Sequence, residues 1–104
     1  MTFEEYQNEA VKTAHTFNAQ YAAIGLAEEV GEYISHVKKE EFHGRDEQYD
    51  SKLEELGDVL WYLNLACISQ GTSLEEIAKR QIAKARKRHG DKYNPAFYHV
   101  ESKK

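Results

Sequence analysis

Two nearly identical acidic strings lie 26 residues apart in this chain. They read Glu28-Glu29-Val30-Gly31-Glu32 and Glu54-Glu55-Leu56-Gly57-Asp58. Residues three apart on a helix share a face, so each string presents a pair of carboxylates side by side. Two such helices packed together bring four carboxylates into one place, where they repel one another unless hard cations lie between them. The repeat therefore predicts a magnesium site.

A helical wheel, at about 100° per residue, ranks the acidic side chains by direction. Glu28 and Glu54 turn away, towards water or the back of a site. The carboxylates that share one flank of their helices, beside an apolar stripe, are those of Glu29, Glu32, Glu55 and Asp58. A solvated helix face would explain one such pair, but two matched pairs favour a ligand site.

Gly31 and Gly57 occupy matching places inside the two strings. A glycine in a helix interior costs about 1 kcal/mol relative to alanine. That cost at two matched positions indicates the close approach of a backbone or a ligand, with helix–helix packing as the competing explanation.

The type of donor selects the metal. Carboxylate oxygens without cysteine suit Mg²⁺ or Mn²⁺ rather than Zn²⁺. A di-iron bundle would require Glu-x-x-His, and neither string continues in that way. His36 stands four residues after Glu32, and we expect it at the surface or behind the ligands.

Helical periodicity and end signals predict the elements that position these carboxylates. The predicted helices span residues 2–16, 19–42, 51–70 and 73–89. Capping boxes that begin at Thr2, Ser51 and Ser73 mark three of the starts. Gly71 and Gly90 mark two of the ends. No segment alternates with period two, so the predicted fold class is all-α, a four-helix bundle.

Apolar stripes indicate how the helices pack. The stripes of the second and third helices are Ala27, Val30, Ile34 and Val37, and Leu53, Leu56, Leu60, Leu63 and Cys67. The third helix carries a second apolar set on its back, formed by Trp61, Leu65 and Ile68. A helix that is apolar nearly all round must be buried nearly all round, which predicts a homodimer or homotetramer. The alternative is that the fourth helix covers the back face.

Length and composition limit the number of domains, the partners and the location that we expect. A chain of 104 residues allows one domain with a small core. Its net charge of -4 argues against binding to nucleic acid polymers, but not against a nucleotide whose charge is offset by a metal. No apolar window is long enough to span a membrane. A single cysteine permits no intrachain disulfide and fits a cytoplasmic location.

The pattern Glu28-Glu29-x-x-Glu32 followed by Glu55-x-x-Asp58 resembles that of the MazG-like all-α nucleoside triphosphate pyrophosphohydrolases. The resemblance covers roughly residues 3–90, and we expect one domain over residues 1–91 followed by a tail over residues 92–104. It implies hydrolysis between the α- and β-phosphates of a nucleoside triphosphate, giving a monophosphate and pyrophosphate. It implies that Glu29, Glu32, Glu55 and Asp58 bind Mg²⁺, with Glu28 as a candidate for steering the attacking water.

Basic and aromatic side chains complete the expected site. The resemblance suggests that Lys84 and Arg88 reach the phosphates, although Gln81 and His89-Gly90 depart from the family pattern. Lys39 is a further candidate for phosphate contact. Tyr62, one turn after Asp58, could bind a phosphate or cover the core, and Trp61 could stack on a base or lie at an oligomer interface. Phosphoribosyl-ATP pyrophosphatase and a non-catalytic helical oligomerisation module remain the alternative functions.

Overall fold

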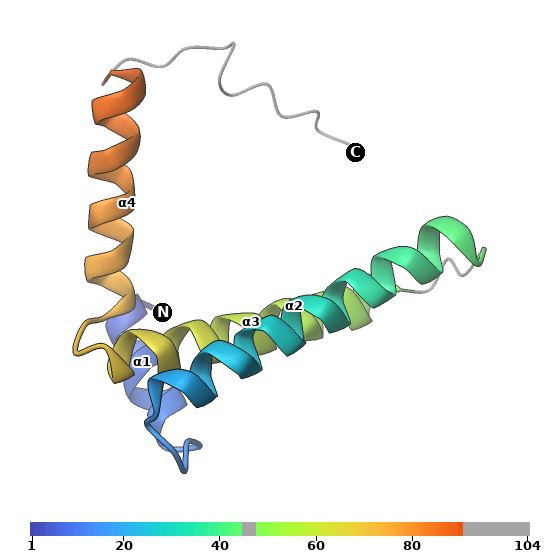
Figure 1. The fold of residues 1–104 in the computed structure, drawn as a ribbon, viewed down its shortest axis with the longest axis horizontal. Helices are drawn as coiled ribbons and strands as arrows, with labels where there is room; N and C mark the ends of the chain where they lie inside the picture. The colour runs from blue at the N-terminus through green and yellow to red at the C-terminus, as the bar shows by residue number, and fades with distance from the viewer. Residues whose placement is uncertain (45–47, 91–104) are drawn as a thin grey trace.

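The computed structural model describes residues 1–44 and 48–90 of the chain. These residues form four helices and no strand, which confirms the all-α class (Figure 1). The helices are α1 (Phe3–Val11), α2 (Ala19–Phe42), α3 (Tyr49–Ser69) and α4 (Leu74–His89). The predicted tail, 92–104, lies outside the described residues.

Side-chain caps set the start of α1 and α2. Thr2 accepts a hydrogen bond from the amide of Glu5, whose carboxylate accepts one from the Thr2 amide, so the predicted capping box is present. The predicted extension of this helix to residue 16 is wrong, because the chain tightens after Val11 into turns with hydrogen bonds between residues three apart. Asn18 then caps α2, accepting hydrogen bonds from two amides.

The start of α3 differs from the prediction. The helix begins at Tyr49 with Gln48 as its N-cap, so Ser51 lies inside the first turn and the capping box expected there is wrong. Its end agrees with the prediction, because Gly71 adopts a φ of 77° just after the last turn. Ser73 caps α4 through the Glu76 amide. Gly90, with a φ of 79°, closes α4.

The helices α2 and α3 form a long antiparallel hairpin (Figure 1). The short α1 packs against α3 and the first part of α4, beside the end of the hairpin where α2 begins. From that end α4 projects away from the hairpin, and it contacts α1 and α3 but not α2 within the described residues. The carboxylate strings therefore lie within the hairpin, and α4 lies to one side.

The observed burial of several apolar side chains differs from the predicted packing. Leu65, from the back set of α3, is only 2% exposed within this one chain, whereas it was expected at an oligomer interface. The stripe residues Val30, Ile34, Leu53 and Leu56, expected in the core, are 41 to 56% exposed. The reason is that the two helices meet along the flanks that carry Glu29 and Glu55, which places the stripes at the side of the hairpin.

One glycine explains how closely the hairpin packs. A Cβ atom on Gly25 of α2 would overlap the ring of Tyr62 on α3. Gly31 and Gly57, which were expected at a close approach, have no such neighbour within 4 Å in the described chain. The close approach is therefore at Gly25, one turn before the first acidic string.

None of the helices in the described ranges is both long and apolar enough to cross a membrane.

Candidate active site

The hairpin brings together carboxylates from both acidic strings. Glu29 of α2 and Glu55 and Asp58 of α3 each offer an oxygen atom, and these atoms lie within 4.8 Å of one another. Glu29 and Glu55 are half-buried at the seam between α2 and α3, and Asp58 is exposed. Three of the four carboxylates selected by the helical wheel thus meet in one place.

The electrostatics of this cluster oppose its full ionisation. Burial raises the pKa of Glu29, and a hydrogen bond with Glu55 and the negative charges of Asp58, Glu55 and Glu32 raise it further. Glu55 Oε2 is buried and has no hydrogen-bond donor among the described residues. When Glu29 is ionised it has no proton to donate, so no donor within residues 1–44 and 48–90 compensates Glu55 Oε2.

A divalent cation fits this arrangement. The cluster supplies hard oxygen donors of one charge sign, which Mg²⁺ and Mn²⁺ prefer. A cation between the carboxylates would give Glu55 Oε2 the partner that it does not find in the described part of the chain, and would reverse the upward pKa shift of Glu29.

The other acidic residues of the two strings lie around the cluster. Glu32 is exposed and does not join the three clustered oxygens, but its charge contributes to the raised pKa of Glu29. Glu28 is also exposed, and its charge contributes to a raised pKa of Tyr62. Glu54 is exposed, as the wheel predicts.

Aromatic side chains flank the cluster on the side of Gly25. The rings of Tyr21 and Tyr62 lie 6.1 Å apart between centroids. A hydrogen bond with Tyr21, together with burial and the nearby Glu29 and Glu28 charges, raises the pKa of Tyr62 to about 12. Tyr62 therefore stays protonated at neutral pH and can act as a hydroxyl donor. From α1, Tyr6 also approaches, and burial and the Asp58 charge raise its pKa.

The Trp61 side chain contacts residues of its own chain. Its indole Nε1 donates a hydrogen bond to Thr13 Oγ1 at 2.9 Å, and its ring meets the edge of Tyr62 at 4.9 Å between centroids. The indole ties the segment after α1 to the middle of α3. This contact differs from the oligomer interface expected for Trp61.

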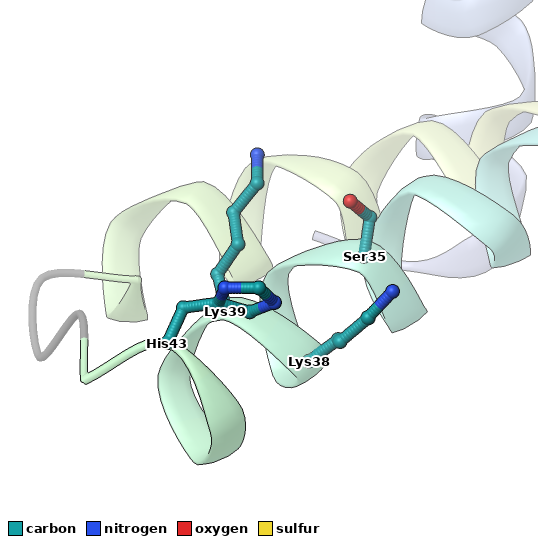
Figure 2. A pocket seen from close by; sticks show the side chains of 4 residues that line it. All are labelled: Ser35, Lys38, Lys39 and His43. Atoms are coloured by element: carbon teal, nitrogen blue, oxygen red, sulfur yellow. The ribbon is translucent and has the colours of Figure 1, made fainter.

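Lys39 lines a basic hollow on the second half of α2. The hollow has a volume of about 270 Å³ and is lined by Ser35, Lys38, Lys39 and His43 (Figure 2). Figure 2 shows the side chains of these four residues, and among residues 1–44 and 48–90 no carboxylate lines the hollow. Such a surface suits an anion.

Lys84 and Arg88 are exposed on α4 and do not join the carboxylates within one chain. Asp58 lies eleven residues before the end of α3, or about 16 Å along its axis. Lys84 lies ten residues past the start of α4, or about 15 Å along a helix that leaves the hairpin (Figure 1). These two cations therefore stand apart from the acidic cluster.

His36 and Gln48 lie next to the cluster. His36 was expected at the surface or behind the ligands, whereas Gln48 was not expected near the site. His36 Nε2 lies 3.7 Å from Glu55 Oε1, and its Nδ1 lies 2.8 Å from Gln48 Oε1. The helical wheel places His36 on the same flank of α2 as Glu29, so its direction could be predicted from the sequence. Gln48 offered no signal, because it was assigned to a loop.

Comparison with known families agrees with this geometry. The model of the MazG nucleotide pyrophosphohydrolase domain matches residues 17–92, which include α2, α3 and α4. The chain belongs to this family. Both acidic strings fall inside the match, and α1 precedes it. Comparisons with curated proteins and with solved structures gave no match. Family membership supports a nucleotide pyrophosphohydrolase activity in general.

Proposed function

We propose that this protein hydrolyses nucleoside and deoxynucleoside triphosphates to the monophosphate and pyrophosphate in a Mg²⁺-dependent reaction that removes surplus or noncanonical nucleotides. The observation that carries the proposal is the meeting of Glu29, Glu55 and Asp58 within 4.8 Å, where a buried Glu55 oxygen has no hydrogen-bond partner among the residues that the structure describes. The family match supports the reaction class.

Glu29, Glu55 and Asp58 would hold the cation, and Glu32 would join them by a change of rotamer from its exposed position. Mg²⁺, or Mn²⁺ in its place, would neutralise phosphate charge and lower the pKa of water. Glu28 is exposed beside Tyr62, where its carboxylate is free to orient the attacking water.

The basic hollow lies on nearly the same face of α2 as Glu32, nearer the C-terminal end of the helix. Lys39 lies seven residues after Glu32, about 10 Å along the axis, and therefore on nearly the same face. We assign Lys39 to the distal phosphates of the substrate. Tyr62, which keeps its proton, can donate a hydrogen bond to the nucleotide. Trp61 would contribute to the nucleotide pocket through the orientation of Tyr62, whose ring it contacts.

Lys84 and Arg88 can serve the phosphates only from a neighbouring copy, because α4 leaves the hairpin within one chain. We therefore propose that the protein acts as a homodimer or homotetramer. The exposed apolar stripes of α2 and α3 provide the surface for such an assembly.

A panel of nucleoside and deoxynucleoside triphosphates with Mg²⁺, scored for pyrophosphate and monophosphate, tests the activity. We expect pyrophosphate release from the wild type and a loss of at least about 100-fold in kcat/KM for Asp58→Asn, which removes a charged ligand of the cation. Asp50→Asn is the matched control, because Asp50 is exposed in the first turn of α3, and it should keep the wild-type rate.

Release of orthophosphate alone would contradict the proposed reaction. Hydrolysis of phosphoribosyl-ATP and of no other substrate would favour that alternative. No product and no Mg²⁺-dependent stabilisation would favour a helical oligomerisation module.

A further inference from the structure

The basic hollow on α2 lies in line with the acidic strings. It has a volume of about 270 Å³ and is lined by Ser35, Lys38, Lys39 and His43 (Figure 2). Ser35 stands three residues after Glu32, about 4.5 Å along the helix axis, and residues three or four apart share a helix face. A ligand that extends along this face of α2 from the acidic cluster therefore reaches the hollow.

The charge of the hollow is positive. Lys38 and Lys39 form no ion pair within residues 1–44 and 48–90. Glu40, which follows Lys39 in the sequence, is bound instead to Lys52 of α3 at 2.7 Å. The C-terminal end of a helix carries about half an elementary negative charge, which two ammonium groups exceed. The hollow therefore favours an anion.

The lysine side chains reach back towards the acidic strings. Side chains on an α-helix lean towards its N-terminal end and cover the turn before their own Cα atom. Figure 2 shows Lys38 extended along α2 towards Ser35. Ser35 and Lys39 are half-buried, which limits the freedom that their side chains lose when they bind a ligand. The donors of the hollow thus lie nearer to Glu32 than the sequence positions of the lysines imply.

Aromatic side chains lie on the other side of the cluster along α2. Tyr21 precedes Glu29 by eight residues, about 12 Å along the axis, and its ring lies 6.1 Å from that of Tyr62 between centroids. Lys39 follows Glu29 by ten residues, about 15 Å along the axis. Aromatic rings suit a base, whereas ammonium groups suit phosphate oxygens. The order of aromatic rings, carboxylates and amines therefore distinguishes the two ends of a nucleotide.

We propose that the basic hollow binds the terminal phosphates of the substrate through Ser35, Lys38 and Lys39, so that the nucleotide lies along α2 with its base towards Tyr21. The inference rests on the proposed function for the identity of the substrate. It goes further in adding Ser35 and Lys38 to the site, in giving the direction of the bound nucleotide, and in predicting a preference for triphosphates over diphosphates.

Binding of inorganic pyrophosphate, measured by calorimetry with Mg²⁺ and without nucleotide, tests the hollow. We expect Lys38→Ala with Lys39→Ala to weaken pyrophosphate binding by about tenfold or more, and Ser35→Ala, which removes a neutral donor, by about threefold. Lys79→Ala with Arg80→Ala is the matched control, because it removes two exposed cations from α4, where each pairs with a glutamate of its own helix. The control should stay within about threefold of the wild type.

The direction of the substrate predicts a second result. A nucleoside diphosphate has no γ-phosphate to fill the hollow. Loss of Lys38 and Lys39 should therefore lower kcat/KM for the triphosphate by about tenfold or more, and for the diphosphate by about threefold or less. Equal losses on both substrates would overturn the proposed direction.

Unchanged pyrophosphate binding without Lys38 and Lys39, or an equal loss in the α4 control, would overturn the proposal. A loss confined to Lys84→Ala with Arg88→Ala would also overturn it, because the terminal phosphates would then belong to α4 alone. If pyrophosphate binding depends on the hollow but no nucleotide is hydrolysed, the proposed function is refuted and the hollow remains a pyrophosphate site.

Discussion

At the residue scale, Glu29 lies in surroundings that disfavour its ionisation. Its pKa is raised above the ordinary value by burial and by the surrounding carboxylates. A folded-state pKa above the unfolded value stabilises the protein at low pH, and this contribution is lost as the pH rises through the folded pKa. The metal-free protein should therefore lose stability as Glu29 ionises, and a bound cation should restore it.

Glu29→Gln tests this prediction, because an amide of similar size carries no charge. We expect the metal-free variant to have a higher Tm than the wild type at pH 7.5, with a difference that shrinks as the pH falls below the raised pKa of Glu29. Mg²⁺ should raise the Tm of the wild type and of Asp50→Asn, but not that of Glu29→Gln. An equal response of all three proteins to Mg²⁺ would refute the assignment of Glu29 as a ligand.

The direction of the acidic side chains could be predicted from the sequence because it depends only on the helical period. Glu29 and Glu55 were selected by their angle, and they do meet across the seam. The contact of His36 with Glu55 could not be predicted with the same ease. It depends on the register between α2 and α3 and on a glutamine whose side chain is not used for capping.

At the element scale, the hairpin depends on the close approach of α2 and α3 at Gly25. Any larger residue there would meet the Tyr62 ring, which lies one turn past Asp58. The sequence indicated Gly31 and Gly57 for the close approach instead. The free-energy cost of a glycine within a helix can be recognised from the sequence, but the side chain that packs against that glycine cannot. The helix ends were predicted where a positive-φ glycine or a hydroxyl cap decides them, as at Gly71 and Ser73.

Gly25→Ala should therefore separate the two helices or displace Tyr62. We expect a lower Tm and a reduced kcat/KM, since Tyr62 and the acidic cluster share the same seam. Thermal unfolding by circular dichroism and the pyrophosphate assay measure the two effects. Gly57→Ala is the matched comparison: its Cβ meets nothing within 4 Å, so the better helix propensity of alanine should hold or raise the Tm. A Tm for Gly25→Ala at or above that of Gly57→Ala would contradict the packing described.

At the scale of the whole molecule, one chain leaves much of its apolar surface uncovered. Val30 and Ile34 on α2 and Leu53 and Leu56 on α3 are all more than 40% exposed. Each stripe lies at a similar wheel angle from the acidic flank of its helix, and these flanks meet at the seam of an antiparallel hairpin. We therefore expect both stripes on the same face of the hairpin. A second hairpin laid on this face would form a four-helix arrangement around a larger core.

The face of the hairpin therefore predicts the oligomeric state. Ile34 is 56% exposed and Leu56 is 46% exposed, so a glutamate at either position is tolerated in a single chain but is buried when two hairpins pack together. We expect the wild type to sediment as a dimer or tetramer in analytical ultracentrifugation, and Ile34→Glu with Leu56→Glu to shift it to monomer with loss of activity. Phe42→Glu, at an apolar residue that is 81% exposed in the last turn of α2, controls for a general effect of added charge. A wild type that sediments as a monomer and still hydrolyses nucleotides would show that the stripes serve another purpose and that Lys84 and Arg88 take no part in the reaction.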